Sequence, residues 1–281
     1  MRKAPLKGAA AVTGFDGGAV AILFCVTHEQ LTYPAYDAPL MEAYGGRFES
    51  VYVMLHPFVS VPEDLAWKVT QQYPSDEQIL SAGAKCTWAQ VSAETGLGTC
   101  ARLNQAMLTT IRSIDEALSD YAASKTLTSF LESGSVWMPT EGRFEPLLQG
   151  DFLDAFEAAG QEELIFVPEF PGPEFPGLAF SGLAIPGIEA VRRSSVKRLR
   201  DGEETFPSRG TLAAPDESFL LTVDWDSFFT LFYGPRAFVD EVVHRQDLEG
   251  FFAAPTTEHS WFNYSLGCSA VTVYPDSWVI S

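Results

Sequence analysis

The feature that most constrains the fold is the irregular order in which strand-like and helix-like patterns follow one another. Residues 48–58 ("FESVYVMLHPF") and 163–170 ("ELIFVPEF") are rich in aromatic and β-branched residues and predict strands. Between them, residues 103–121 carry apolar side chains at steps of three and four, which predicts one continuous helical stripe. No regular strand–helix–strand rhythm joins these segments. The sequence therefore predicts an α+β fold, a single domain with a mixed or antiparallel sheet flanked by helices.

Capping residues predict where two shorter helices begin. Ser75 with Gln78, and Thr87 with Gln90, have the spacing of a capping box. In this motif the N-cap side chain accepts a hydrogen bond from the backbone N–H of the third helical residue. The side chain of that residue in turn accepts the backbone N–H of the N-cap residue. Gly96 is expected to end the second helix, because glycine adopts the left-handed conformation of a helix C-terminus without strain.

The apolar run "LLTVDWDSFFTLFYGP" predicts a hairpin, with strands over residues 219–225 and 228–233 and a turn at Asp226-Ser227. Side chains alternate along a strand, so Asp224 and Asp226 are expected on one face and Trp225 on the other. In the structural interpretation Trp225 fills the core, Asp224 faces water and Asp226 stabilises the turn. We prefer this interpretation, because no third ligand stands at a defined spacing.

A chemical interpretation of the same residues remains open. Two carboxylates on one face are suitable ligands for a hard divalent cation. His259, in the segment "TTEHSWFNY", is a candidate general base that would join Asp224 and Asp226 in an acid–base site. The alternative is that His259 is an ordinary surface residue of a loop.

Charge excludes some partners and favours others. The chain of 281 residues has 18 basic and 37 acidic residues and a net charge of -19. Such a field repels nucleic acid and anionic membranes and favours a basic partner. Apolar residues make up 46% of the chain, which is enough to build a buried core.

The negative charge is concentrated between residues 144 and 191, where Lys and Arg are absent. We expect residues of this region to bind a basic protein, with aromatic side chains of the adjoining loop as anchors. The residues predicted to contact this partner are Asp151, Asp154, Glu157, Phe170 and Phe175. The alternative is an acidic surface without a partner. The basic run "RRSSVKRLR" that follows is expected to be one face of a solvated helix, paired with the neighbouring acids.

Known catalytic and metal-binding motifs are absent. The four cysteines, Cys25, Cys86, Cys100 and Cys268, are widely spaced, and no CxxC, HExxH, GxSxG, GxGxxG or Walker-type sequence occurs. We therefore expect no metal and no cofactor, and buried thiols in a cytoplasmic protein.

Domain boundaries follow from composition. Residues 1–30 begin with "MRKAPLK" and are expected to form a flexible or peripheral extension, because their apolar run is short and interrupted by glycines. Residues 31–281 are expected to form the single α+β domain. Four prolines and four glycines lie between residues 171 and 187, which predicts a long loop there.

A second alternative for function is DNA binding. The sequence "TWAQVSAETGLGTCARLNQAMLTTI" resembles a helix-turn-helix, with Gly96 at the turn and Thr99, Arg102 and Asn104 placed to face bases. The acidity of the chain argues against this interpretation, because it opposes approach to phosphates.

Five short motifs in order, "LHPFV", "YPSDEQI", "WMPTEG", "VDWDSFFTL" and "LEGFF", resemble an uncharacterised bacterial family, a domain of unknown function. The likeness spans residues 48–261. It implies a single domain and supplies no activity. The C-terminal part, from "DWDS" to "LEGFF", is also similar to the end of bacterial immunity-type proteins.

Taken together, these features predict a non-enzymatic, acidic protein-binding domain with an immunity or antitoxin-like role, since an acidic face can occlude a basic toxin. The alternative is a small-molecule hydrolase or other enzyme that uses Asp224, Asp226 and His259. Convergence of these three side chains would favour the enzyme.

Overall fold

The computed structural model describes residues 31, 33–34, 38–62, 73–133, 136–168, 191–224 and 227–259. The predicted extension of residues 1–30 and the predicted loop of residues 171–187 lie outside these ranges. So does the C-terminal part of the chain after His259.

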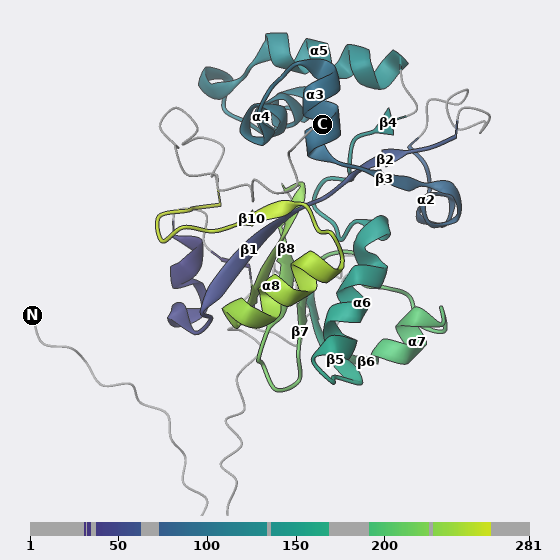
Figure 1. The fold of residues 1–281 in the computed structure, drawn as a ribbon, viewed down its shortest axis with the longest axis vertical. Coiled ribbons are helices and arrows are strands. Elements are labelled where there is room, and N and C mark those ends of the chain that lie inside the picture. The colour runs from purple at the N-terminus through teal and green to yellow at the C-terminus, as the bar shows by residue number, and fades with distance from the viewer. Residues whose placement is uncertain are drawn as a thin grey trace, which may run out of the picture.

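Two antiparallel sheets form the framework (Figure 1). The large sheet has seven strands in the order β10-β1-β9-β8-β7-β5-β6. These strands are β1 (Ser50–Leu55), β5 (Glu163–Pro168), β6 (Arg192–Ser195), β7 (Gly210–Ala213), β8 (Leu220–Val223), β9 (Phe229–Gly234) and β10 (Gly250–Phe252). The small sheet has three strands, β2 (Phe58–Ser60), β3 (Ala84–Cys86) and β4 (Val136–Trp137), in the order β3-β2-β4. Antiparallel pairing throughout, with helices interspersed, confirms the predicted α+β class.

Helices surround the sheets. The α-helices are α2 (Asp76–Ala82), α3 (Trp88–Thr95), α4 (Cys100–Ile111), α5 (Tyr121–Ser133), α6 (Gln149–Ala158), α7 (Val196–Arg200) and α8 (Arg236–Arg245). Short 3-10 helices are η2 (Leu40–Gly46), η3 (Glu116–Leu118) and η4 (Pro146–Leu148). Figure 1 shows α3, α4 and α5 grouped beyond one end of the large sheet, beside the small sheet.

Alternation along the strands gives the large sheet two apolar faces. In β1, Tyr52 and Met54 belong to the core that packs against α6, α7 and α8, and Figure 1 shows α6 and α8 over that face. The intervening residues Val51 and Val53 belong to the opposite core, which includes residues of η2, α3, α4 and α5. We call this second side the η2 face. Asp224 follows β8, and the candidate site lies on the η2 face.

Both predicted capping boxes are confirmed. The Ser75 and Thr87 hydroxyls accept hydrogen bonds from the backbone N–H groups of Gln78 and Gln90, whose side chains bond back to the caps. Gly96 ends α3 in the left-handed conformation, at φ 70°. These local features formed as predicted because each depends on residues close together in sequence.

The continuous helix predicted over residues 103–121 is wrong. α4 ends at Ile111, because Arg112 adopts the left-handed conformation at φ 62° and its N–H bonds the carbonyls of Leu108 and Thr109. A new helix, α5, begins at Tyr121. Asp120 precedes it and accepts the N–H of Ala123 at 2.9 Å, so two helices replace the single predicted one.

The helix predicted for the basic run is correct only in part. Arg192 and Arg193 belong to the edge strand β6, and the helix α7 begins at Val196. The predicted pairing with neighbouring acids is confirmed: Arg193 pairs with Glu163 across β5 and β6 at 3.3 Å, and Arg200 pairs with acids of α6.

Candidate acid–base site

Asp224 lies at the end of β8, where the chain turns toward β9. Its carbonyl accepts the backbone N–H and the hydroxyl of Ser227, at 3.2 and 2.9 Å, which closes the predicted hairpin turn. Asp224 is only 4% exposed, so the expectation that it faces water is wrong. Trp225 and Asp226 lie outside the described residues, so the structure leaves their predicted roles untested.

His259 is brought to Asp224 by the segment that follows β10. Residues 39 and 258 form an isolated antiparallel bridge, and the N–H of Leu40 donates to the carbonyl of Thr257 at 2.7 Å. This pairing places the imidazole Nε2 of His259 3.9 Å from Oδ2 of Asp224. His259 is 5% exposed, so the alternative of a surface histidine is wrong.

Tyr33 completes the arrangement. Its hydroxyl lies 2.7 Å from Nδ1 of His259, and the two rings meet edge to face. Phe229 of β9 packs against the imidazole with a centroid distance of 5.4 Å. Sequence reasoning missed Tyr33, because 226 residues separate it from His259 and no spacing rule joins them. We call Tyr33, His259 and Asp224 the relay.

Burial determines the charge of His259. Loss of hydration lowers the pKa of His259 to about 4, although the Asp224 carboxylate acts in the opposite direction. The imidazole is therefore neutral at physiological pH. A neutral imidazole that accepts the Tyr33 proton at Nδ1 carries its own proton on Nε2, the atom that faces Asp224.

Hydroxyl groups continue the polar region across the η2 face. Thr222 stands two residues before Asp224, and its hydroxyl lies 2.8 Å from that of Thr211 on β7. Tyr233 of β9 belongs to the same face, and its buried hydroxyl has no hydrogen-bond partner among the described residues. This face of the sheet therefore offers hydrogen-bonding groups within an otherwise apolar core.

The acids predicted to bind a basic partner form ion pairs within the chain. Asp151 pairs with Lys85 at 2.5 Å, and Arg200 pairs with Asp154 at 2.5 Å and with Glu157 at 3.0 Å. Asp154 and Glu157 remain about half exposed, whereas Asp151 is mostly buried. Phe170 and Phe175, the predicted aromatic anchors, lie outside the described residues.

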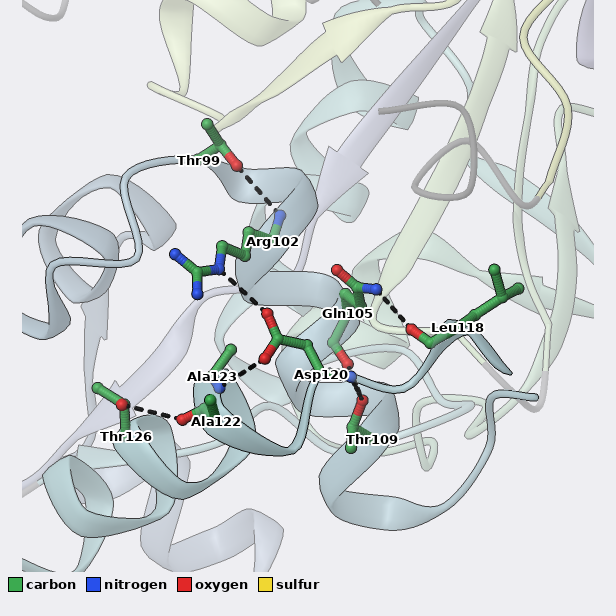
Figure 2. A network of polar contacts seen from close by, with 9 residues as sticks. All are labelled: Thr99, Arg102, Gln105, Thr109, Leu118, Asp120, Ala122, Ala123 and Thr126. Atoms are coloured by element: carbon green, nitrogen blue, oxygen red, sulfur yellow. Dashed lines mark hydrogen bonds and ion pairs between the residues drawn. The ribbon is translucent and has the colours of Figure 1, made fainter. Parts of the chain in front are cut away.

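The residues of the helix-turn-helix hypothesis have structural roles (Figure 2). Thr99 caps α4 by accepting the N–H of Arg102, and the Arg102 guanidinium bonds Asp120 at 3.2 Å. Asn104 of α4 is only 1% exposed, so it does not face outward as base reading requires.

Neither a metal-binding cluster nor a membrane-spanning helix is found among the described residues. No group of three or more His, Cys, Asp or Glu side chains there is arranged to hold a metal ion. None of the helices there combines the length and apolar character needed to cross a membrane.

Comparisons with known sequences relate this chain to a protein family and to one bacterial protein. The profile of the family "Protein of unknown function (DUF2711)" matches residues 36–175 and 188–263, which include Asp224 and His259 but not Tyr33. The "Uncharacterized protein YwbB" of Bacillus subtilis (strain 168) is 21% identical over 238 residues, covering 80% of this chain and 96% of that protein. No solved structure matches the chain significantly.

Proposed function

This chain belongs to the DUF2711 family of proteins of unknown function, and we propose that it is an acid–base enzyme of hydrolase type. The predicted resemblance to an uncharacterised bacterial family is thereby confirmed. The observation that carries the proposal is the convergence of three polar side chains, Tyr33, His259 and Asp224, at the end of β8 on the η2 face.

The order of the three groups defines the proton path. Neutral His259 accepts the proton of the Tyr33 hydroxyl across the 2.7 Å contact at Nδ1. The imidazolium that forms carries a proton on Nε2 and faces the Asp224 carboxylate. The 3.9 Å separation is longer than a hydrogen bond, but the Asp224 carboxylate across it favours the imidazolium and so opposes part of the loss of hydration that lowers the pKa of His259. As the Tyr33 oxygen attacks a substrate acyl carbon, His259 passes the proton that it accepted to the leaving group, and water then releases the acyl group from Tyr33.

Burial supports a functional role for these groups. A histidine and a carboxylate removed from water lose hydration, and that loss destabilises the fold unless compensated. Hydrophobic residues would cover the same end of β8 without this penalty. Tyr33, in contrast, is only partly buried, so its hydroxyl is the member of the relay nearest to solvent.

Covalent labelling of Tyr33 tests this function without a known substrate. A small aryl sulfonyl fluoride reacts with activated phenols, and peptide mass spectrometry identifies the modified residue. We expect Tyr33 to react about tenfold faster than Tyr121, an exposed phenol that serves as the internal reference. His259→Gln should bring Tyr33 down to the rate of Tyr121 and leave Tyr121 unchanged.

A matched folding control accompanies the labelling. The far-UV circular dichroism of His259→Gln must equal that of the parent, so that lost reactivity reports lost activation. If Tyr33 of the parent reacts no faster than Tyr121, the proposal of an activated phenol is wrong.

A second candidate function is binding of a basic protein, which the net charge of -19 favours. Asp154 and Glu157 are half-exposed carboxylates suited to steering such a partner. Their reversal to Lys would also place like charge beside Arg200, so neutral variants give a cleaner test. We expect Asp154→Asn with Glu157→Gln to slow association with a basic partner, and added salt to slow it further. An association rate insensitive to both changes would contradict this candidate.

A further inference from the structure

A surface pocket of about 340 Å³ lies at the connection between α4 and α5, and it shares no lining residue with the relay. Its volume lies within the range of small-molecule sites, roughly 300–1,000 Å³. The lining residues are Thr109, Arg112, Ile114, Glu116, Ser119 and Tyr121.

A hydrogen-bond network holds the pocket wall in place (Figure 2). Gln105 of α4 donates to the carbonyl of Leu118 at 2.5 Å, and the N–H of Asp120 donates to the hydroxyl of Thr109 at 3.1 Å. The Asp120 carboxylate also bonds Arg102 and caps α5 at Ala123. The connection is therefore fixed to both helices, and a ligand would meet a wall that is already organised.

Two opposite charges line this pocket without neutralising each other. Within the described part of the chain, the side chains of Arg112 and Glu116 form no hydrogen bond or ion pair, either with one another or with other residues. Arg102, ten residues earlier on α4, is different, because its guanidinium forms an ion pair with Asp120. A guanidinium and a carboxylate held apart in one pocket are complementary to a ligand that carries both charges.

The backbone at Arg112 supports a role for this side chain. Its φ of 62° lies in the left-handed region, where glycine or asparagine is the usual residue at the end of a helix. An arginine there has a strained backbone, and such positions are more common at binding sites than elsewhere.

The pocket also has an apolar side. Tyr121, which lines the pocket, is 61% exposed, and Leu118, three residues earlier in the sequence, is 38% exposed, although both are large apolar residues. Ile114 lines the same pocket and is partly buried against the core. An apolar ligand group placed here would remove exposed aromatic and aliphatic surface from water.

We propose that this pocket binds a free α-amino acid with an apolar side chain. The carboxylate of the ligand pairs with Arg112, its ammonium group pairs with Glu116, and its side chain packs on Tyr121 and Ile114. Glu116 and the net charge of -19 disfavour phosphates and dicarboxylates, which carry further negative charge.

Titration calorimetry with L-phenylalanine and L-leucine tests the site. We expect saturable binding with a dissociation constant of about 1 mM or lower. L-Phenylalanine methyl ester lacks the carboxylate, and N-acetyl-L-phenylalanine lacks the ammonium group. Each should bind at least about tenfold more weakly, because each leaves one charged side chain of the pocket unpaired.

Substitutions at Arg112 and Glu116 test which charged group of the ligand each side chain binds. Arg112→Gln should weaken binding of L-phenylalanine about tenfold and remove the preference for the amino acid over its methyl ester. Glu116→Gln should likewise remove the preference over the N-acetyl form. Lys125→Gln and Glu132→Gln change exposed charges of α5 that do not line the pocket, and both should leave affinity unchanged.

Three results would each overturn the proposal. The first is absence of saturable binding of both amino acids. The second is equal affinity of the parent protein for L-phenylalanine and its blocked forms. The third is that the control variants weaken binding as much as the pocket variants do, which would indicate a general charge effect.

Discussion

Buried titratable side chains dominate the chemistry at the scale of single residues. Glu145 is fully buried near Arg143, and burial raises the pKa of Glu145 to about 7. His56 is fully buried as well, and burial lowers the pKa of its imidazole to about 3. In each case the neutral form is favoured, since a charged form would lose its hydration. The stability of the protein should therefore depend on pH in two opposite directions.

Glu145→Gln should stabilise the protein above pH 7. The pKa of Glu145 is higher in the folded chain than its ordinary value of 4.5, so its contribution is present at low pH. It is lost as pH rises through about 7, and the loss is at most on the order of 3 kcal/mol. We expect the variant to gain melting temperature at pH 8 and little at pH 5. The exposed Glu132→Gln is the control, and equal gains at both pH values would contradict the assignment.

His56→Gln should reduce the sensitivity of the protein to acid. The pKa of His56 is lower in the folded chain than its ordinary value of 6.5, so its contribution is present above 6.5 and is lost as pH falls toward 3. The variant loses the contact between Nε2 and Thr230, at 2.8 Å, and should be less stable at pH 7. Urea unfolding between pH 7 and 4 should nevertheless show a shallower decline for the variant. An unchanged slope would mean that other groups control acid unfolding.

At the scale of helices and strands, the break at Arg112 separates buried from exposed apolar residues. Met107 of α4 is fully buried, whereas Leu118, on the same predicted stripe, is 38% exposed. A continuous helix would bury both. The break turns the chain so that α5 packs beside α4, with the Thr110 and Ser124 hydroxyls 2.9 Å apart.

Met107→Asp and Leu118→Asp distinguish the two arrangements. An unpaired carboxylate at Met107 enters a dry core and should destabilise the protein by about 4 kcal/mol or unfold it. At Leu118 the same group remains hydrated, and the expected change is below about 1 kcal/mol. Urea denaturation followed by circular dichroism measures both. Comparable destabilisation by the two variants would support the continuous helix.

At the scale of the whole molecule, negative charge exceeds what the cations neutralise. The chain has 37 acidic and 18 basic residues, and many described cations are already paired within the chain, as Arg200 is with Asp154 and Glu157. Exposed ion pairs of this kind contribute little to stability. Self-repulsion among the remaining carboxylates is therefore the larger long-range effect.

Added salt should raise the melting temperature. Between about 0.01 and 0.15 M ionic strength the screening length falls from about 30 to 8 Å, which weakens repulsion across the surface more than contacts within ion pairs. We expect NaCl and KCl to stabilise the protein alike, as measured by differential scanning calorimetry. A melting temperature that falls with both salts would show that the ion pairs outweigh the repulsion.

The sequence by itself determined several local features of the structure. Both capping boxes, the end of α3 at Gly96 and the hairpin around Ser227 formed as predicted. Each depends on residues within a few positions of one another, whose conformational preferences hold in most surroundings. The α+β class was predictable for a related reason, because the spacing of apolar residues distinguishes strands from helices.

Only the tertiary structure decided the candidate site. Asp224 and His259 were named from the sequence as polar residues suited to acid–base chemistry. Their burial, however, depends on the pairing between Leu40 and Thr257, and the position of Tyr33 depends on the same segments. Contacts across more than 200 residues leave no spacing in the sequence, because the intervening chain can take any length. The charge of His259 follows from those contacts, since burial keeps its imidazole neutral.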